Sequence, residues 1–95
     1  MNIATWNLNR ASAKGSRGQR IRRHLAEHEV DVWTLTETSI ELSPGPGWKG
    51  VFSAPRAQAR ADERWVAVWA RGVEPGVLTT GDSDRTAAAC VRVAG

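Results

Sequence analysis

The chain has 95 residues and a mass of 10.3 kDa, which allows one small domain and excludes a large multidomain enzyme. Its composition, 41% hydrophobic and 24% charged, is that of a soluble globular chain rather than a disordered or collagen-like one. The formal charge of +3 permits anionic partners such as nucleic acid but does not require them.

The single cysteine, Cys90, excludes an internal disulfide framework and offers neither a zinc-finger spacing nor a C-x-x-C redox pair. The first residues lack the basic segment and apolar run of a secretory signal. No stretch of the sequence approaches the roughly 18 apolar residues of a membrane span. These features predict a cytoplasmic protein without a membrane span.

The first third of the chain predicts a strand, a helix and a second strand. Residues 3–8 are short, apolar and rich in β-formers, and the polar residues 9–17 follow them as a loop. Residues 17–29 carry Ile21 and Leu25 four positions apart, the spacing of an amphipathic helix, and residues 30–36 are again β-like. This order is typical of a right-handed crossover between two parallel strands.

The remainder of the chain predicts strands separated by turns. The Pro- and Gly-rich residues 43–47 break the chain, and turn-forming residues recur at 74–76 and 81–84. Four strand-like runs lie around these breaks, at residues 48–53, 64–71, 76–80 and 86–94. We therefore expect an α/β fold in which a βαβ unit is followed by an antiparallel meander in a mixed sheet.

Asn7 and Glu37 are the first candidate site residues. Both stand at the carboxyl ends of the predicted parallel strands, where open α/β sheets bind their ligands. A carboxylate and a carboxamide oxygen would form part of the shell of Mg²⁺ or Mn²⁺, hard cations that retain several waters. The alternative at this point is a strand-end Glu37 that is merely solvated.

Two spaced motifs resemble a known family. Residues 3–9 (Ile-Ala-Thr-Trp-Asn-Leu-Asn) and, one helix later, residues 31–38 (Asp-Val-Trp-Thr-Leu-Thr-Glu-Thr) look like the opening of the endonuclease/exonuclease/phosphatase superfamily, the DNase I-like phosphoesterases. Residues 65–71 and 85–91 resemble that family's next core strands. The resemblance implies part of a two-sheet sandwich and cleavage of phosphate esters by water with Mg²⁺, in which Glu37 binds the metal directly.

The same resemblance implies that Asn7 orients the phosphate and the metal shell. The family's general-base histidine, its Gly-Asp-x-Asn turn and its terminal Asp-His pair lie beyond the point at which this sequence stops. We expect residues 81–84 (Gly-Asp-Ser-Asp) to form a hairpin turn rather than that motif. The sequence is accordingly interpreted as the amino-terminal half of a phosphoesterase, one truncated domain that is inactive alone, with a substrate class that the visible motifs do not specify.

Basic residues dominate the segment before the first acidic residue, Glu27. Arg10 and Lys14 follow the strand that carries Asn7 and are placed to approach a phosphate, whereas the helix arginines predict a solvated face. Asn9 and Arg10 are therefore candidate substrate-binding residues. The alternative function is a non-catalytic module that binds phosphate or nucleic acid.

His24-Leu25-Ala26-Glu27-His28 matches H-x-x-E-H, a helical zinc motif of inverted zinc peptidases. The helix is short and no downstream third ligand is indicated, so we expect partly exposed imidazoles instead.

A last expectation concerns the run at residues 64–71, which is apolar on both faces although the sequence predicts only one covering helix. An uncovered face would drive self-association or require a missing carboxy-terminal half.

Overall fold

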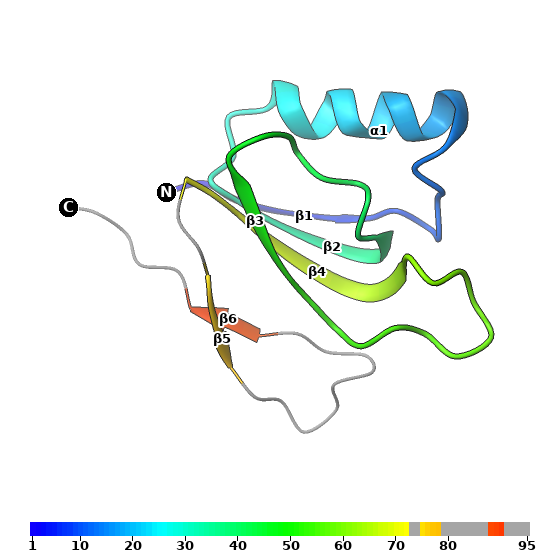
Figure 1. The fold of residues 1–95 in the computed structure, drawn as a ribbon. Coiled ribbons are helices and arrows are strands. Elements are labelled where there is room, and N and C mark those ends of the chain that lie inside the picture. The colour runs from blue at the N-terminus through cyan, green and yellow to red at the C-terminus, as the bar shows by residue number, and fades with distance from the viewer. Residues whose placement is uncertain (73–74, 79–87, 91–95) are drawn as a thin grey trace.

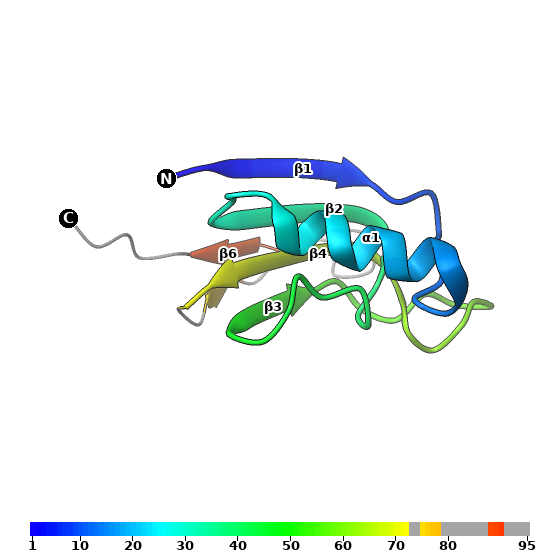
Figure 2. The same ribbon diagram turned by 90° about the horizontal axis from the view of Figure 1, so that it is seen from above.

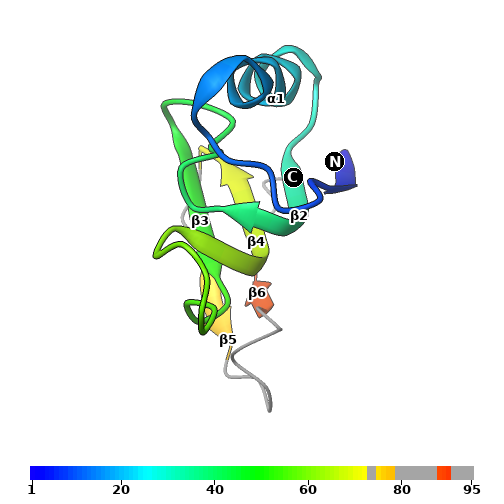
Figure 3. The same cartoon turned by 90° about the vertical axis from the view of Figure 1, so that its right-hand side faces the viewer.

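The computed structural model describes residues 1–72, 75–78 and 88–90. One helix and six strands follow in the order β1 (Ile3–Asn7), α1 (Gly15–Glu27), β2 (Val32–Ser39), β3 (Trp48–Phe52), β4 (Glu63–Arg71), β5 (Gly76–Leu78) and β6 (Ala88–Cys90). Figures 1 and 3 show α1 on one side of a sheet formed by β1 to β4, and the short β5 and β6 on the other side. No helix in the described ranges is long and apolar enough to cross a membrane.

The main sheet is mixed, as the sequence predicts. Its strand order is β1-β2-β4-β3, with β1 parallel to β2 and the other two pairs antiparallel. The register places Ile3 opposite Val32 and Asn7 opposite Thr36, so β1 ends beside Thr36, three residues before the end of β2. The βαβ unit is therefore confirmed, and α1 provides the crossover (Figure 2).

The predicted meander is wrong beyond β4. β4 is hydrogen-bonded to β2 along one edge and to β3 along the other, so it has no free edge to offer the next strand. β5 and β6 instead pair with each other in a separate two-stranded sheet. The predicted turn at residues 81–84 lies outside the described residues.

The core lies between α1 and the sheet. Ile21 and Leu25 project from α1 and are buried in one cluster with Trp33, Leu35 and Trp69 of the sheet. The alternation of strand side chains aims Trp33 and Leu35 at the helix from the same face of β2. The indole Nε1 of Trp33 donates a 3.3 Å hydrogen bond to the carbonyl oxygen of Leu25, which satisfies a polar group inside this apolar layer.

The sequence predicts that the face of the sheet opposite α1 is uncovered, but several residues on this face are buried. Val32, Val51 and Ala70 on this face are buried, and Val66 and Val68 are half-buried. β5 and β6 lie on this side in Figure 3. The expectation of an uncovered apolar face is therefore wrong for Val32, Val51 and Ala70, whereas the expected self-association stays a prediction.

Gly18 permits the close approach of α1 to the loop that precedes it. A Cβ at this buried position would overlap the carbonyl of Ala13 and lie 2.8 Å from the Ala13 Cα. Overpacking costs about 1–3 kcal/mol, and the better helix propensity of alanine returns about 1 kcal/mol. We expect Gly18→Ala to lower the free energy of unfolding by up to about 2 kcal/mol in urea denaturation.

The neighbouring Gln19 is exposed on the same helix and provides the control. Gln19→Ala should leave the unfolding free energy within about 0.5 kcal/mol of the wild-type value. A Gly18→Ala variant as stable as the wild type would contradict the proposed close packing.

Candidate functional site

Asn7 and Glu37 meet at the carboxyl ends of β1 and β2. The Asn7 side-chain nitrogen Nδ2 donates a 2.8 Å hydrogen bond to Oε2 of Glu37. The Asn7 oxygen Oδ1 accepts a hydrogen bond of the same length from the backbone N–H of Asn9. This second contact fixes the orientation of the carboxamide, because only its nitrogen is then free to face the carboxylate. Asn7 thus holds Glu37 in place.

Backbone pairing continues past the end of β1 and brings the loop to this edge. The N–H of Leu8 donates to the carbonyl of Thr36 at 2.9 Å, and the N–H of Arg10 donates to the carbonyl of Glu37 at 2.8 Å. Asn9, Arg10 and Glu37 all have positive φ angles, of 55°, 61° and 48°. Non-glycine residues adopt this left-handed region at a cost, and such residues cluster at functional sites.

The Glu37 carboxylate has the chemistry of a ligand for a hard cation. It is half-buried, and its Oε1 has no hydrogen-bond partner in the part of the chain that the structure describes. Among residues 1–72, 75–78 and 88–90, no three His, Cys, Asp or Glu side chains gather into a metal-binding group. The edge therefore offers one free carboxylate oxygen, which fits a cation such as Mg²⁺ or Mn²⁺ that keeps most of its waters.

The predicted substrate-binding residues, Asn9 and Arg10, both lie near Asn7 and Glu37 but make different contacts. Asn9 contributes its backbone N–H to Asn7, and its side chain is exposed. The Arg10 guanidinium contacts Oε2 of Glu63, at 3.3 Å from Nε and 3.2 Å from Nη2, and is half-exposed. Arg10 thus lies at the edge but is bound to a second carboxylate rather than to Glu37.

Glu63 is the centre of a cluster that the sequence did not reveal. Its side chain is only 3% exposed and pairs with Arg10 and Arg56 through Oε2 and with Arg60 through Oε1, at 3.0 to 3.4 Å. The Arg56 guanidinium also lies 3.7 Å from the ring centroid of Trp65. Glu63, Arg10 and Arg56 are far apart or in no recognisable pattern in the sequence, so local sequence patterns do not reveal their contacts. We call Glu63, Arg10, Arg56 and Arg60 the Glu63 cluster.

Asp62 adds an ionised group beside this cluster. The hydroxyl of Ser39 donates a 2.6 Å hydrogen bond to Oδ2 of Asp62 and holds the pKa of that carboxyl below its usual value. Arg60 lies 3.6 Å from the other oxygen. Because folding lowers this pKa, the ionised form supports the fold at neutral pH, and that support is lost as the pH falls through the lowered value.

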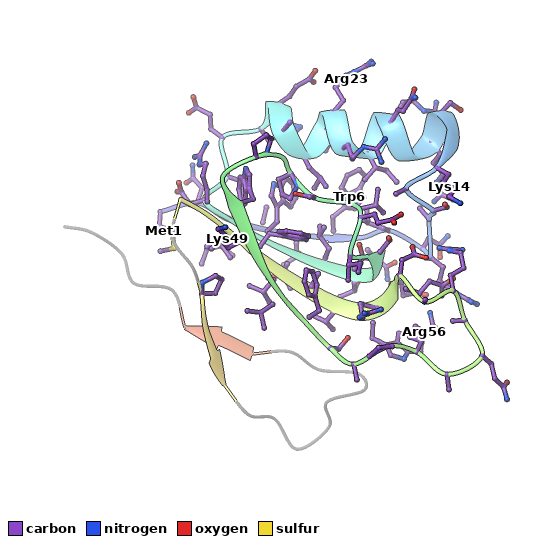
Figure 4. All side chains as sticks on the ribbon, viewed as in Figure 1. Met1, Trp6, Lys14, Arg23, Lys49 and Arg56 are labelled. Carbon is purple, nitrogen blue, oxygen red and sulfur yellow. The ribbon has the colours of Figure 1, made fainter. Side chains whose placement is uncertain are left out.

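The arginines of α1 divide into two groups. Arg17 and Arg22 donate to the loop carbonyls of Leu8 and Ala13, at 3.5 Å and 2.7 Å. Arg20 and Arg23 are exposed, as expected for a solvated face, and Arg23 points away from the sheet in Figure 4. The same view shows Lys14 and Arg56 at one end of the molecule, the end at which β1 and β2 finish.

The Glu63 cluster should stabilise the fold through its buried carboxylate. Glu63→Gln removes the negative charge and leaves three guanidiniums without their shared partner, although Arg10 and Arg60 can turn into solvent. We expect the free energy of unfolding to fall by about 1–3 kcal/mol in urea denaturation. Glu41→Gln, at an exposed position, is the matched control and should change it by less than about 0.5 kcal/mol. Equal effects of the two substitutions would show that the cluster does not stabilise the protein.

No family model matches the sequence, and no match is found among curated proteins or solved structures.

Proposed function

We propose that this chain supplies the metal-binding half of a phosphoesterase site, in which Glu37 binds Mg²⁺ or Mn²⁺ and Asn7 orients it. The supporting observation is the 2.8 Å hydrogen bond that joins these two residues at the carboxyl ends of two parallel strands. The resemblance of residues 3–9 and 31–38 to the DNase I-like phosphoesterases assigns roles to the same pair. One carboxylate oxygen of Glu37 would coordinate the cation, and Asn7 would orient that carboxylate.

The proposed chemistry is hydrolysis of a phosphate ester by water. The bound cation would neutralise charge on the phosphoryl oxygens. This chain contributes the carboxylate that holds the cation, the carboxamide that orients the carboxylate, and positive charge from Arg10 and Lys14 at the same end of the molecule. Nucleic acid, lipid and sugar phosphates all have the chemistry that such a site recognises.

The residues at the Asn7 and Glu37 edge do not include a candidate for the general base. The two histidines of the chain, His24 and His28, both belong to α1 or its C-terminal cap rather than to the edge that carries Glu37. A missing general base reduces rates by about 10²–10⁴. We therefore propose that turnover requires groups beyond the Asn7 and Glu37 edge.

Metal binding provides the first test. In calorimetric titration with Mn²⁺, Glu37→Gln should weaken binding at least about tenfold, because the amide lacks the charge of the ligand. Asn7→Ala should weaken it about 10–100-fold, as is typical when the partner of a ligand is lost. Glu41→Gln should bind like the wild type. Unchanged affinity in Glu37→Gln would refute the site.

A non-catalytic module that binds phosphate or nucleic acid is the second candidate function, favoured by the arginines of the Glu63 cluster beside the edge.

Hydrolysis of bis(p-nitrophenyl) phosphate by the isolated chain, with and without Mg²⁺, should not exceed background under either hypothesis. A fluorescent oligonucleotide separates the two: a binding module holds it equally well in EDTA, with affinity that falls steeply with salt. Robust Mg²⁺-dependent hydrolysis by a nuclease-free preparation would contradict both candidate functions.

A further inference from the structure

His24 and His28 converge at the end of α1. His24 lies in the last turn of the helix, and His28 caps it with an extended backbone. Their ring centroids are 4.1 Å apart, and Nδ1 of His24 lies 3.3 Å from Nε2 of His28. Both residues are exposed, so neither ring is packed away from solvent. The i and i+4 spacing places both rings on one side of the helix, and the backbone turn at His28 accompanies their close approach.

The separation of the two nitrogens matches a metal chelate. Imidazole nitrogens lie about 2.0–2.1 Å from Zn²⁺, and two such ligands in a tetrahedral shell are therefore about 3.3–3.4 Å apart. The observed 3.3 Å is close to this separation. In the metal-free pair one of the two nitrogens carries the shared hydrogen. For both nitrogens to bind a metal, the ring that carries this hydrogen must adopt its other tautomer, with the hydrogen on the ring nitrogen that does not face the other histidine.

Neighbouring residues restrain the His24 ring, and the C-terminal end of the helix favours a bound cation. Trp6 packs against His24 with ring centroids 4.8 Å apart, and Trp6 itself packs on the core (Figure 4). Leu25, next to His24, is fully buried and anchors this turn of α1. The last turn of a helix also carries a partial negative charge from its unpaired carbonyls, which stabilises cations there. His24 is thus held by its neighbours, and His28 lies at the C-terminal cap of the helix.

We propose that His24 and His28 form a binding site for a divalent transition metal such as Zn²⁺, Ni²⁺ or Cu²⁺. The two nitrogens occupy two positions of the metal, and water or a group from another molecule occupies the rest. Imidazole selects these borderline metals, whereas the carboxylate edge at Glu37 suits Mg²⁺ and Mn²⁺. The two sites therefore differ in chemistry as well as in position, and this inference does not depend on the proposed phosphoesterase function.

Calorimetric titration with Ni²⁺ tests the proposal directly. The wild-type chain should bind Ni²⁺, and His24→Gln and His28→Gln should each weaken binding at least about tenfold, because each leaves a single ligand. Glu27→Gln, within the same motif, and Glu41→Gln, at an exposed position outside both proposed sites, are the matched controls and should retain wild-type affinity. Mg²⁺ at the same concentrations should not compete.

Thermal unfolding gives a second readout that does not depend on heat of binding. A metal that binds only the folded chain raises the melting temperature with concentration. Ni²⁺ should raise the melting temperature of the wild type and of Glu27→Gln, but not that of His28→Gln, whose exposed position allows it to fold. Undiminished Ni²⁺ affinity in His28→Gln, or loss of binding in Glu27→Gln, would overturn the assignment.

Discussion

The parallel pairing of β1 with β2 is the constraint on which the candidate site depends. Two parallel strands need a crossover, and α1 provides it by burying Ile21 and Leu25 against the sheet. Once the strands lie parallel, their carboxyl ends share one edge of the sheet. Asn7 and Glu37, 30 positions apart in the sequence, then come within a 2.8 Å hydrogen bond. The site is thus a product of the sheet register rather than of any local motif.

The backbone at this edge is held in a conformation that it would not adopt alone. Three of the four non-glycine residues with positive φ in the described chain, Asn9, Arg10 and Glu37, meet there. Each such residue costs about 1–3 kcal/mol, and the hydrogen bond from the Arg10 N–H to the Glu37 carbonyl holds two of them together. The core under α1 therefore supports a strained edge of the sheet, where the backbone of Glu37 is held in place.

The two proposed metal sites differ in the chemistry of their ligands. At the carboxyl edge, the buried Glu63 offsets part of the positive charge of three arginines, while the Glu37 carboxylate keeps one oxygen free. Near the C-terminal end of α1, two imidazole nitrogens lie 3.3 Å apart. Oxygen donors suit hard cations and imidazoles suit borderline ones, so the two places need not compete for the same metal.

The sequence by itself determined the βαβ unit, the mixed character of the sheet and the placement of Asn7 and Glu37 at one edge of it, because the period of apolar residues and the order of elements specify them. Only the tertiary structure decided that β4 lies between β2 and β3, that β5 and β6 pair apart, and that Glu63 gathers three arginines. The i and i+4 histidines were visible in the sequence, but the approach of their nitrogens was not. Strand order, ion pairs and ring orientations depend on contacts between residues distant in sequence or on side-chain rotation, which local patterns do not encode.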